Sequence, residues 1–338
     1  MRLAMSSAVA LAISLAGLAG AHAQPSPSTS EAAGDFHHRG SGITLPARIG
    51  DMRRGEQRDL SNGGEFDLIV QYGSNTEPAT LYIYRSAYPN PALWYERTRR
   101  AMNANIAAGA GDAWPRGFAL GSGSQNGLRE EIELPEGSRF RSTAVAIAQV
   151  GQWMVKARIT SPRLDKAGIA ARMDALLGGL SLPASESPTH PLRLPSACSE
   201  SLPLDGSPIR GDRESEIASA TALGAIEFAQ ARGSGGLAAD PSSWCRSSGP
   251  LDQHGSTYRQ RDGSAWVVLL GDSGTAISGR SLASTGRDGA AIFASTPAWT
   301  RIANVYDSLP SPEQAVEPAV PVLVGQERGL AEINVRAD

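Results

Sequence analysis

The chain has 338 residues, of which 41% are hydrophobic, and its 31 Lys and Arg residues against 34 Asp and Glu give a formal net charge of −3. A near-neutral chain without a Lys/Arg cluster lacks the electrostatic footprint of proteins that bind nucleic acids or anionic membrane surfaces. Both are therefore poor candidates as partners.

The N-terminal segment has the pattern of an export signal. A positive charge at Arg2 precedes an apolar stretch from about Ala8 to Ala21, which is shorter than the roughly 20 residues of a membrane-spanning helix. The stretch ends in Ala21-His22-Ala23, whose small-x-small form is the one that signal peptidases cleave. The sequence predicts a signal peptide over residues 1–23, cleavage after Ala23, and a periplasmic or secreted protein with no membrane span.

The chain contains two cysteines, Cys198 and Cys245. An even count in an exported protein favours pairing, so the sequence predicts a disulfide between them. Closing a loop of this size stabilises a fold by about 4 kcal/mol in the chain-entropy model. The alternative, a reactive thiol at one position, would leave the other cysteine unpaired.

The first half of the chain opens with a leader and then changes character. Residues 24–42 are rich in Pro, Ser, Gly and Ala, a composition that predicts disorder. Apolar and polar residues then alternate over 67–72 and again over 81–84, which predicts a pair of strands. Asn90-Pro91 is typical of a helix start and Gly109 of a helix end.

Three further strands and a helix complete the first half. The same alternation predicts strands at 128–134, 143–150 and 153–159. In the last of these, Lys156 and Arg158 face away from the apolar side. Residues 169–180 have the spacing of a helix with one apolar stripe, and Pro183 ends it.

The element order ββαβββα predicts an α+β fold for residues 43–182, an antiparallel sheet with covering helices. The strand pair around Gly151-Gln152-Trp153, followed at once by Leu164-Asp165 to Leu180-Ser181-Leu182, resembles the closing strands and helix of PsbP-like domains. This resemblance covers the first half only. It implies a PsbP-like sandwich that acts in binding or assembly, and no functional residue carries over from it.

The second half is predicted to be a smaller α+β domain over residues 209–309. A Pro/Ser-rich linker at 183–208 precedes it, and a Pro-rich, extended tail follows at 310–338. Within the domain, the patterns predict a helix from Asp212 to Arg232, hairpins that turn at Asp262-Gly263 and at Gly271 to Gly274, a strand at 290–295 and a short helix at 299–306.

One serine stands where a nucleophile could stand. The run Val267 to Thr275 resembles the nucleophile segment of the GDSL esterases, and its Gly-Asp-Ser-Gly resembles that of trypsin-like proteases. Both resemblances break down, because no His follows His254 and the protease pattern needs another Gly. A serine hydrolase that uses Ser273 with His254 and Asp252 remains. The alternative is a hairpin turn, where Gly, Asp and Ser are common.

Two other clusters could bind a ligand. His37-His38 with Asp35 could hold a metal ion, but the further ligands at fixed spacing are missing, so chance surface residues are the better account. The glycine-rich run 121–127 precedes a strand, so it offers no helix N-terminus for a phosphate and is predicted to be a flexible loop. The sequence predicts no metal site and no cofactor.

Acidic residues and tyrosines form two further groups. One predicted strand carries Glu130, Glu131 and Glu133. These form a charged strand face unless a second carboxylate lies across a cleft, as a glycosidase requires. Another stretch carries Tyr82, Tyr84 and Tyr88. Tyr82 and Tyr84 fall on one side of their strand, where core packing is favoured over a binding face.

The missing catalytic set and the PsbP-like first half together favour an exported, non-enzymatic binding or assembly factor of the bacterial cell envelope. Its partner would be an envelope protein or a small ligand. The alternative is an esterase-like serine hydrolase that uses Ser273, His254 and Asp252.

Overall fold

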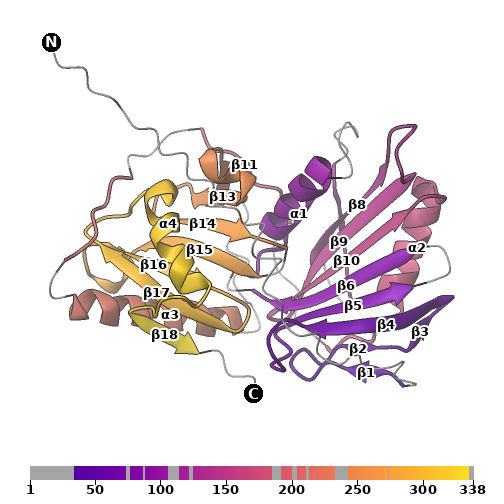
Figure 1. Cartoon of the computed structure of the whole chain (residues 1–338), viewed down its shortest axis with the longest axis horizontal. Coiled ribbons are helices and arrows are strands. Elements are labelled where there is room, and N and C mark those ends of the chain that lie inside the picture. Colours follow the sequence, from indigo (N-terminus) through magenta and orange to yellow (C-terminus); the bar gives the residue numbers. More distant parts are fainter. Residues whose placement is uncertain are drawn as a thin grey trace, which may run out of the picture.

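The computed structural model describes residues 34–73, 77–86, 88–105, 114–121, 125–184, 192–199, 204–210, 213–232, 243–272 and 274–334. These residues form two eight-stranded sheets and a two-stranded pair of β1 (Phe36–His37) with β2 (Thr44–Leu45). The two large sheets lie side by side, with helix α1 (Pro91–Asn105) between them (Figure 1). The predicted signal peptide lies outside the described residues.

The first sheet comes from the N-terminal half of the chain and is antiparallel throughout. Its strands, in spatial order, are β3 (Arg48–Ile49), β4 (Met52–Asp59), β5 (Asp67–Gly73), β6 (Pro78–Arg85), β10 (Trp153–Ser161), β9 (Ser142–Val150), β8 (Gly127–Glu133) and β7 (Arg116–Phe118). The strands predicted from alternation are present in β5, β6, β8, β9 and β10. Alternation marked these strands because their apolar residues point to one common face.

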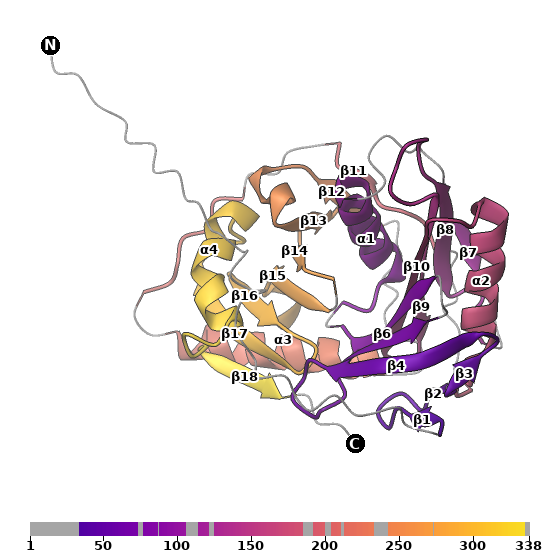
Figure 2. The same ribbon diagram turned by 45° about the vertical axis from the view of Figure 1, so that its right-hand side comes forward.

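One face of the first sheet is a closed apolar layer under α2 (Lys166–Gly178). This helix lies on the side of the sheet turned away from the second sheet (Figure 2). Asp165 caps it by accepting a hydrogen bond from the backbone of Gly168 at 2.8 Å. Met173 of the helix and Ile159 of the sheet are fully buried in this layer, and each such side chain contributes about 1.5–3 kcal/mol to stability.

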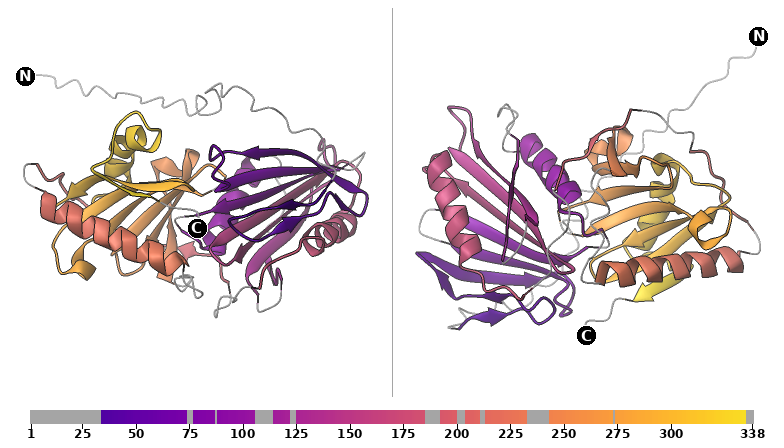
Figure 3. Two further views of the ribbon diagram at one scale, coloured as in Figure 1. Left: turned by 90° about the horizontal axis from the view of Figure 1, so that it is seen from below. Right: turned by 180° about the vertical axis from the view of Figure 1, so that it is seen from behind.

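The second sheet comes from the C-terminal half. Its strands, in spatial order, are β11 (Ser196–Ala197), β12 (Trp244–Ser247), β13 (Gly255–Gln260), β14 (Ala265–Leu270), β15 (Thr275–Ser281), β16 (Ala290–Ser295), β17 (Trp299–Tyr306) and β18 (Ala331–Asn334). Neighbours are antiparallel except β11 and β12, which are parallel. Helices α4 (Pro312–Leu323) and α3 (Glu214–Arg232) cover opposite faces of this sheet (Figure 3).

Helix α1 belongs to both cores. It packs on β8 and β9 of the first sheet and on β13 of the second. Asn90 caps its start by accepting a hydrogen bond from the backbone of Ala92 at 3.0 Å. The hydroxyl of the fully buried Tyr258, on β13, donates to the Leu93 carbonyl at 3.2 Å and also contacts Glu96. A helix encoded in the first half therefore completes the apolar core of the second.

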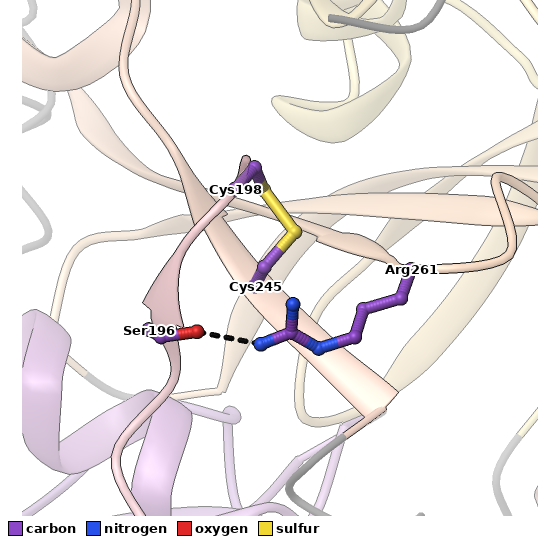
Figure 4. The surroundings of a disulfide bond; sticks show 4 residues. All are labelled: Ser196, Cys198, Cys245 and Arg261. Carbon is purple, nitrogen blue, oxygen red and sulfur yellow. Dashed lines mark hydrogen bonds between the residues drawn. A yellow bond between two sulfur atoms is a disulfide. The ribbon is translucent and has the colours of Figure 1, made fainter. Parts of the chain in front are cut away.

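The predicted disulfide is present. Cys198 and Cys245 are bonded, with their Cα atoms 4.9 Å apart and 47 residues apart in sequence. The bond lies at the edge where β11 joins the second sheet, next to a hydrogen bond of 2.5 Å from Arg261 to Ser196 (Figure 4). The disulfide therefore fixes the segment before α3 to the second sheet.

The predicted α+β class is wrong for this chain. Strands make up 41% and helices 23% of the part of the chain that the structure describes, and the two large sheets dominate it, so the fold is mostly β and not a helix-covered sandwich. Strands without clear alternation account for the error. Strand β4, next to the two-residue edge strand β3, reads Met-Arg-Arg-Gly-Glu-Gln-Arg-Asp, and such a charged strand carries no apolar period.

Three local expectations are also wrong. The segment at 299–306, predicted to be helical, is strand β17, and the tail predicted to be extended contains α4 and β18. The leader, predicted to be disordered, contains β1. The predicted linker contains the short strand β11, next to the disulfide. Within the described part of the chain, no helix is long and apolar enough to cross a membrane.

Candidate functional site

The described structure contains two of the three residues of the predicted hydrolase site, Asp252 and His254. Asp252 lies in a 3₁₀ turn, Pro250–Gln253, and its carboxylate pairs with Arg100 of α1 at 3.2 Å. His254 ends that turn and precedes β13. No hydrogen bond joins these two side chains among the described residues. Ser273 itself lies outside them. The register of Gly255 opposite Leu270 puts His254 at the same end of the sheet as the β14–β15 turn.

That turn contacts the first sheet. The Lys156 amine donates to the Asp272 carbonyl at 2.6 Å. Gly274 has a φ of +70°, and a Cβ there would lie 2.6 Å from the Arg85 carbonyl, a contact that no larger residue could make without a shift of the backbone. The flanks of the turn therefore join the two sheets.

Lys156 is buried at this junction, with 1% of its side chain exposed. Its amine lies 4.1 Å from the centre of the Tyr82 ring and 3.4 Å from the Asp272 carboxylate. Burial lowers the pKa of the amine, and the negative charge of Asp272 opposes that shift. A buried charge with a carbonyl, a carboxylate and an aromatic face around it is a structural tie between the sheets.

His38 is a core residue and not a chance surface histidine. It is fully buried, its Nδ1 accepts from the Ser41 backbone at 3.1 Å, and its Nε2 lies 2.7 Å from the Glu65 carbonyl. Its ring meets the edge of Trp153 at 4.7 Å. Burial lowers the pKa of His38. Both ring nitrogens already have hydrogen-bond partners, so His38 has no nitrogen left for a metal ion.

The other two members of that cluster are also engaged. The His37 ring lies 3.1 Å from the Thr44 hydroxyl, and Asp35 accepts from the Ala47 backbone at 2.9 Å. No group of three metal-ligating side chains occurs among the residues that the structure describes. Part of the glycine-rich run lies outside the described residues. Its Asn126 is buried and bonds the Leu120 backbone at 2.7 Å and 3.0 Å, which closes the loop.

The glutamates do not form one charged face, because consecutive residues of β8 point to opposite sides of the sheet. Glu130 faces α1, where it accepts from the Tyr95 hydroxyl at 2.6 Å and from Arg99 at 2.8 Å. Glu131 faces the α2 side and pairs with Arg129 at 2.6 Å. Both are buried, so each serves an ion pair of its own.

The tyrosines separate into core and surface. Tyr82 and Tyr84 lie on the same face of β6, as predicted, but Tyr84 is fully buried while Tyr82 is half-buried. Tyr88 meets Trp244 edge to face at 6.3 Å, with Arg280 over its ring at 5.3 Å. Tyr84 is thus a core residue, whereas Tyr82 and Tyr88 are half-buried and pack against the cluster that contains it.

A strip of half-buried side chains surrounds Tyr82 on the face of the first sheet opposite to α2. Their neighbours in sequence point into the closed layer and are buried. We call it the open strip; its members, on β5, β6 and β10, are Ile69, Gln71, Thr80, Tyr82 and Arg158. The face is turned towards the second sheet (Figures 1 and 2). Helix α1 covers the neighbouring strands β8 and β9 instead.

Hydrogen-bond donors without partners gather on the open strip. Arg158, Thr80 and Gln71 stand directly across from one another on adjacent strands. The Thr80 hydroxyl donates to the Gln71 side-chain oxygen at 3.0 Å. Within the described part of the chain, the Arg158 guanidinium, the Gln71 amide nitrogen and the Tyr82 hydroxyl have no hydrogen-bond or ion-pair partner. Such donors suit an acceptor-rich ligand.

Sequence reasoning placed Lys156 and Arg158 on the correct face but assigned them no role. Three predicted strands each carry a polar or aromatic residue out of phase with the apolar positions, and this was the available signal. The pairing that aligns Arg158 with Thr80 and Gln71 joins strands about 80 residues apart, so alternation within each strand could not reveal it.

No protein-family model and no curated protein sequence matches this chain. Among solved structures, a crystal structure of a protein from Bacteroides thetaiotaomicron VPI-5482 is similar over 71% of this chain and 87% of its own length. The two share 12% sequence identity, and the TM-score is 0.27. A likeness at this level carries no argument about fold or function. The resemblance of the first half to PsbP-like domains stays a prediction.

Proposed function

We propose that this chain is an exported, non-enzymatic binding or assembly protein of the bacterial cell envelope. Its first 23 residues have the pattern of a cleavable export signal, and the disulfide suits an oxidising compartment. Its partner is a small ligand or another envelope protein. The proposal is consistent with the PsbP-like pattern of the first half.

The distribution of polar groups carries this proposal. Asp252, which a hydrolase would need to orient its histidine, is paired with Arg100 instead. The turn that would present a nucleophile has its flanks against the first sheet. Among the described residues, the open strip presents donors without partners, and such donors suit the binding of a ligand.

A serine hydrolase is the second candidate, and the strand register favours it, because His254 and the β14–β15 turn share one end of the second sheet. A fluorophosphonate probe separates the two functions, since it modifies an activated serine irrespective of the substrate. The mature protein is labelled beside Ser273→Ala. Ser264→Ala, at the opposite end of the same strands, is the matched control, and a known serine hydrolase in the same tube confirms that the probe is active.

We expect no labelling of the mature protein and a mature N-terminus at Gln24 in the periplasmic or culture fraction, read by mass spectrometry. Labelling that disappears in Ser273→Ala but not in Ser264→Ala would show that the protein is a serine hydrolase and would overturn the proposed binding function. A chain that stays in the cytoplasm with its leader intact would overturn export.

A further inference from the structure

We infer that the open strip binds the carboxylate of a small monoanionic ligand, with Arg158 as the anchor. This inference rests on the proposed binding function and names the ligand chemistry for it. The guanidinium of Arg158 is half-buried on β10, and no hydrogen bond or ion pair holds it within the described residues. A planar guanidinium presents two parallel N–H groups, which match the two oxygens of a carboxylate.

The neighbours of Arg158 supply further donors, and no acid of the described residues forms an ion pair with it. Gln71 has its oxygen engaged by Thr80, so its amide nitrogen is the free end. The Tyr82 hydroxyl is a third donor on the same face. Among the five members of the open strip, Arg158 is the one charged residue. An anion that reaches the strip therefore meets donors from three adjacent strands.

The charge balance selects a monoanion over a dianion. On the three strands of the strip, the other cation of this face is Lys156, which is already in contact with Asp272, at 3.4 Å from the carboxylate and 2.6 Å from the carbonyl. On the neighbouring strand β4, Arg58 stands across from Ile69 and pairs with Glu56 at 3.5 Å. β5, β6 and β10 therefore leave one positive charge for the ligand. A phosphate monoester carries close to two negative charges at neutral pH and would need a second cation, whereas a carboxylate carries one.

The strip also contains apolar surface. Ile69 stands across from Tyr82 in the register of β5 and β6, and both side chains are half-buried. An apolar group attached to the carboxylate can cover them and remove their surface from water. The ligand class is therefore a small carboxylic acid with an apolar or aromatic body.

Ligand-observed NMR on the full mature protein tests this inference, with benzoate as the probe. We expect a dissociation constant on the order of 1 mM, as befits a fragment of this size. Benzamide, which keeps the ring and loses the charge, should bind at least about tenfold more weakly. Because this comparison uses the unchanged protein, it holds even if a variant misfolds.

Variants then locate the site. Arg158→Gln should weaken benzoate about tenfold or more, and Arg158→Lys should weaken it severalfold, because the charge stays and the two-pronged geometry is lost. Tyr82→Phe should weaken it about threefold by removing one donor. Arg139→Gln is the matched control, since Arg139 is an exposed arginine in the connection between β8 and β9, away from the open strip; its affinity should equal that of the parent.

Three results would overturn the inference: no saturation by benzoate, equal affinity in Arg158→Gln and the parent, or tighter binding of phenyl phosphate than of benzoate. None of these results would contradict the proposed binding function, because the protein would then bind another ligand or a protein partner. Labelling of Ser273 by the fluorophosphonate probe would instead overturn the proposed function, whatever benzoate does.

Discussion

The two large sheets have the same number of strands, but their faces are covered by helices to different extents. The second sheet is covered on one face by α4 and on the other by α3 and α1, and a disulfide closes its edge. The first sheet has a closed face under α2 and an opposite face that is only partly covered. The comparison shows that helices cover both faces of the second sheet, while one face of the first sheet is left partly open.

Removal of the disulfide, which is a feature of the second sheet only, should have the largest effect on stability. The double variant Cys198→Ser/Cys245→Ser should lose about 4 kcal/mol of unfolding free energy, since the closed loop spans 47 residues. Hydrogen exchange should show a greater loss of protection in β12 and β13 than in β5 and β6. The parent in dithiothreitol is the control. Equal losses in both sheets would mean that they unfold as one unit.

The contrast between the two faces of the first sheet can be tested by truncating one side chain on each. Met173→Ala removes a fully buried side chain from the closed face and should cost about 3 kcal/mol in urea denaturation. Ile69→Ala removes a half-buried side chain from the open strip and should cost about 1 kcal/mol or less. Similar costs at both positions would show that something covers the strip.

The junction between the sheets offers a matched pair of glycines. Both have a positive φ, +60° at Gly271 and +70° at Gly274, but a Cβ would be unhindered at Gly271 and would approach the Arg85 carbonyl to 2.6 Å at Gly274. Gly271→Ala should cost about 1 kcal/mol from backbone strain. Gly274→Ala should cost about 2 kcal/mol more. Equal thermal stabilities of the two variants would mean that the turn does not hold the sheets together.

The smallest expected effect is a pH dependence at the same junction. Because burial lowers the folded-state pKa of Lys156 below its ordinary value of 10.5, the unfolded chain binds more protons in the window between the two values. The contribution of Lys156 to the free energy of unfolding therefore rises as the pH rises through that window and falls as the pH is lowered. The parent should gain stability relative to Lys156→Met as the pH approaches 10.5. A flat difference across this range would contradict the assignment.

The control for that measurement is Lys166→Met, which removes the positive charge of the other lysine, at the exposed start of α2. Unfolding by urea at each pH gives the free energies for all three proteins.

Sequence patterns predicted the parts of this fold that a single strand or helix determines. β10 was predictable because Val155, Ala157 and Ile159 alternate with polar residues, and α2 because its apolar residues follow a helical period. β4 was not, because its charged residues show no apolar period and its pairing with β3 and β5 is made by backbone groups. β17 was mistaken for a helix although its residues pair with both β16 and β18.

The site was harder to predict, because it depends on pairings between distant strands. Asp252, His254 and Ser273 attracted attention by type and order, yet the ion pair with Arg100 comes from a helix 152 residues away in sequence. Similarly, Arg158 shows no local motif, and its place opposite Thr80 appears only when β10 pairs with β6. Side-chain chemistry was visible in the sequence, but the neighbours that decide its role were not.

The position of α1 has a practical consequence for cutting the chain into fragments. A fragment that ends at residue 182 would leave the Leu93 carbonyl and Glu96 without Tyr258 and would expose the apolar side of the helix to water. A fragment that begins at residue 209 would lose both that helix and the cysteine partner of Cys245. A cut at the predicted linker, residues 183–208, therefore yields two fragments with exposed apolar surface. Expression trials should keep the two halves in one chain.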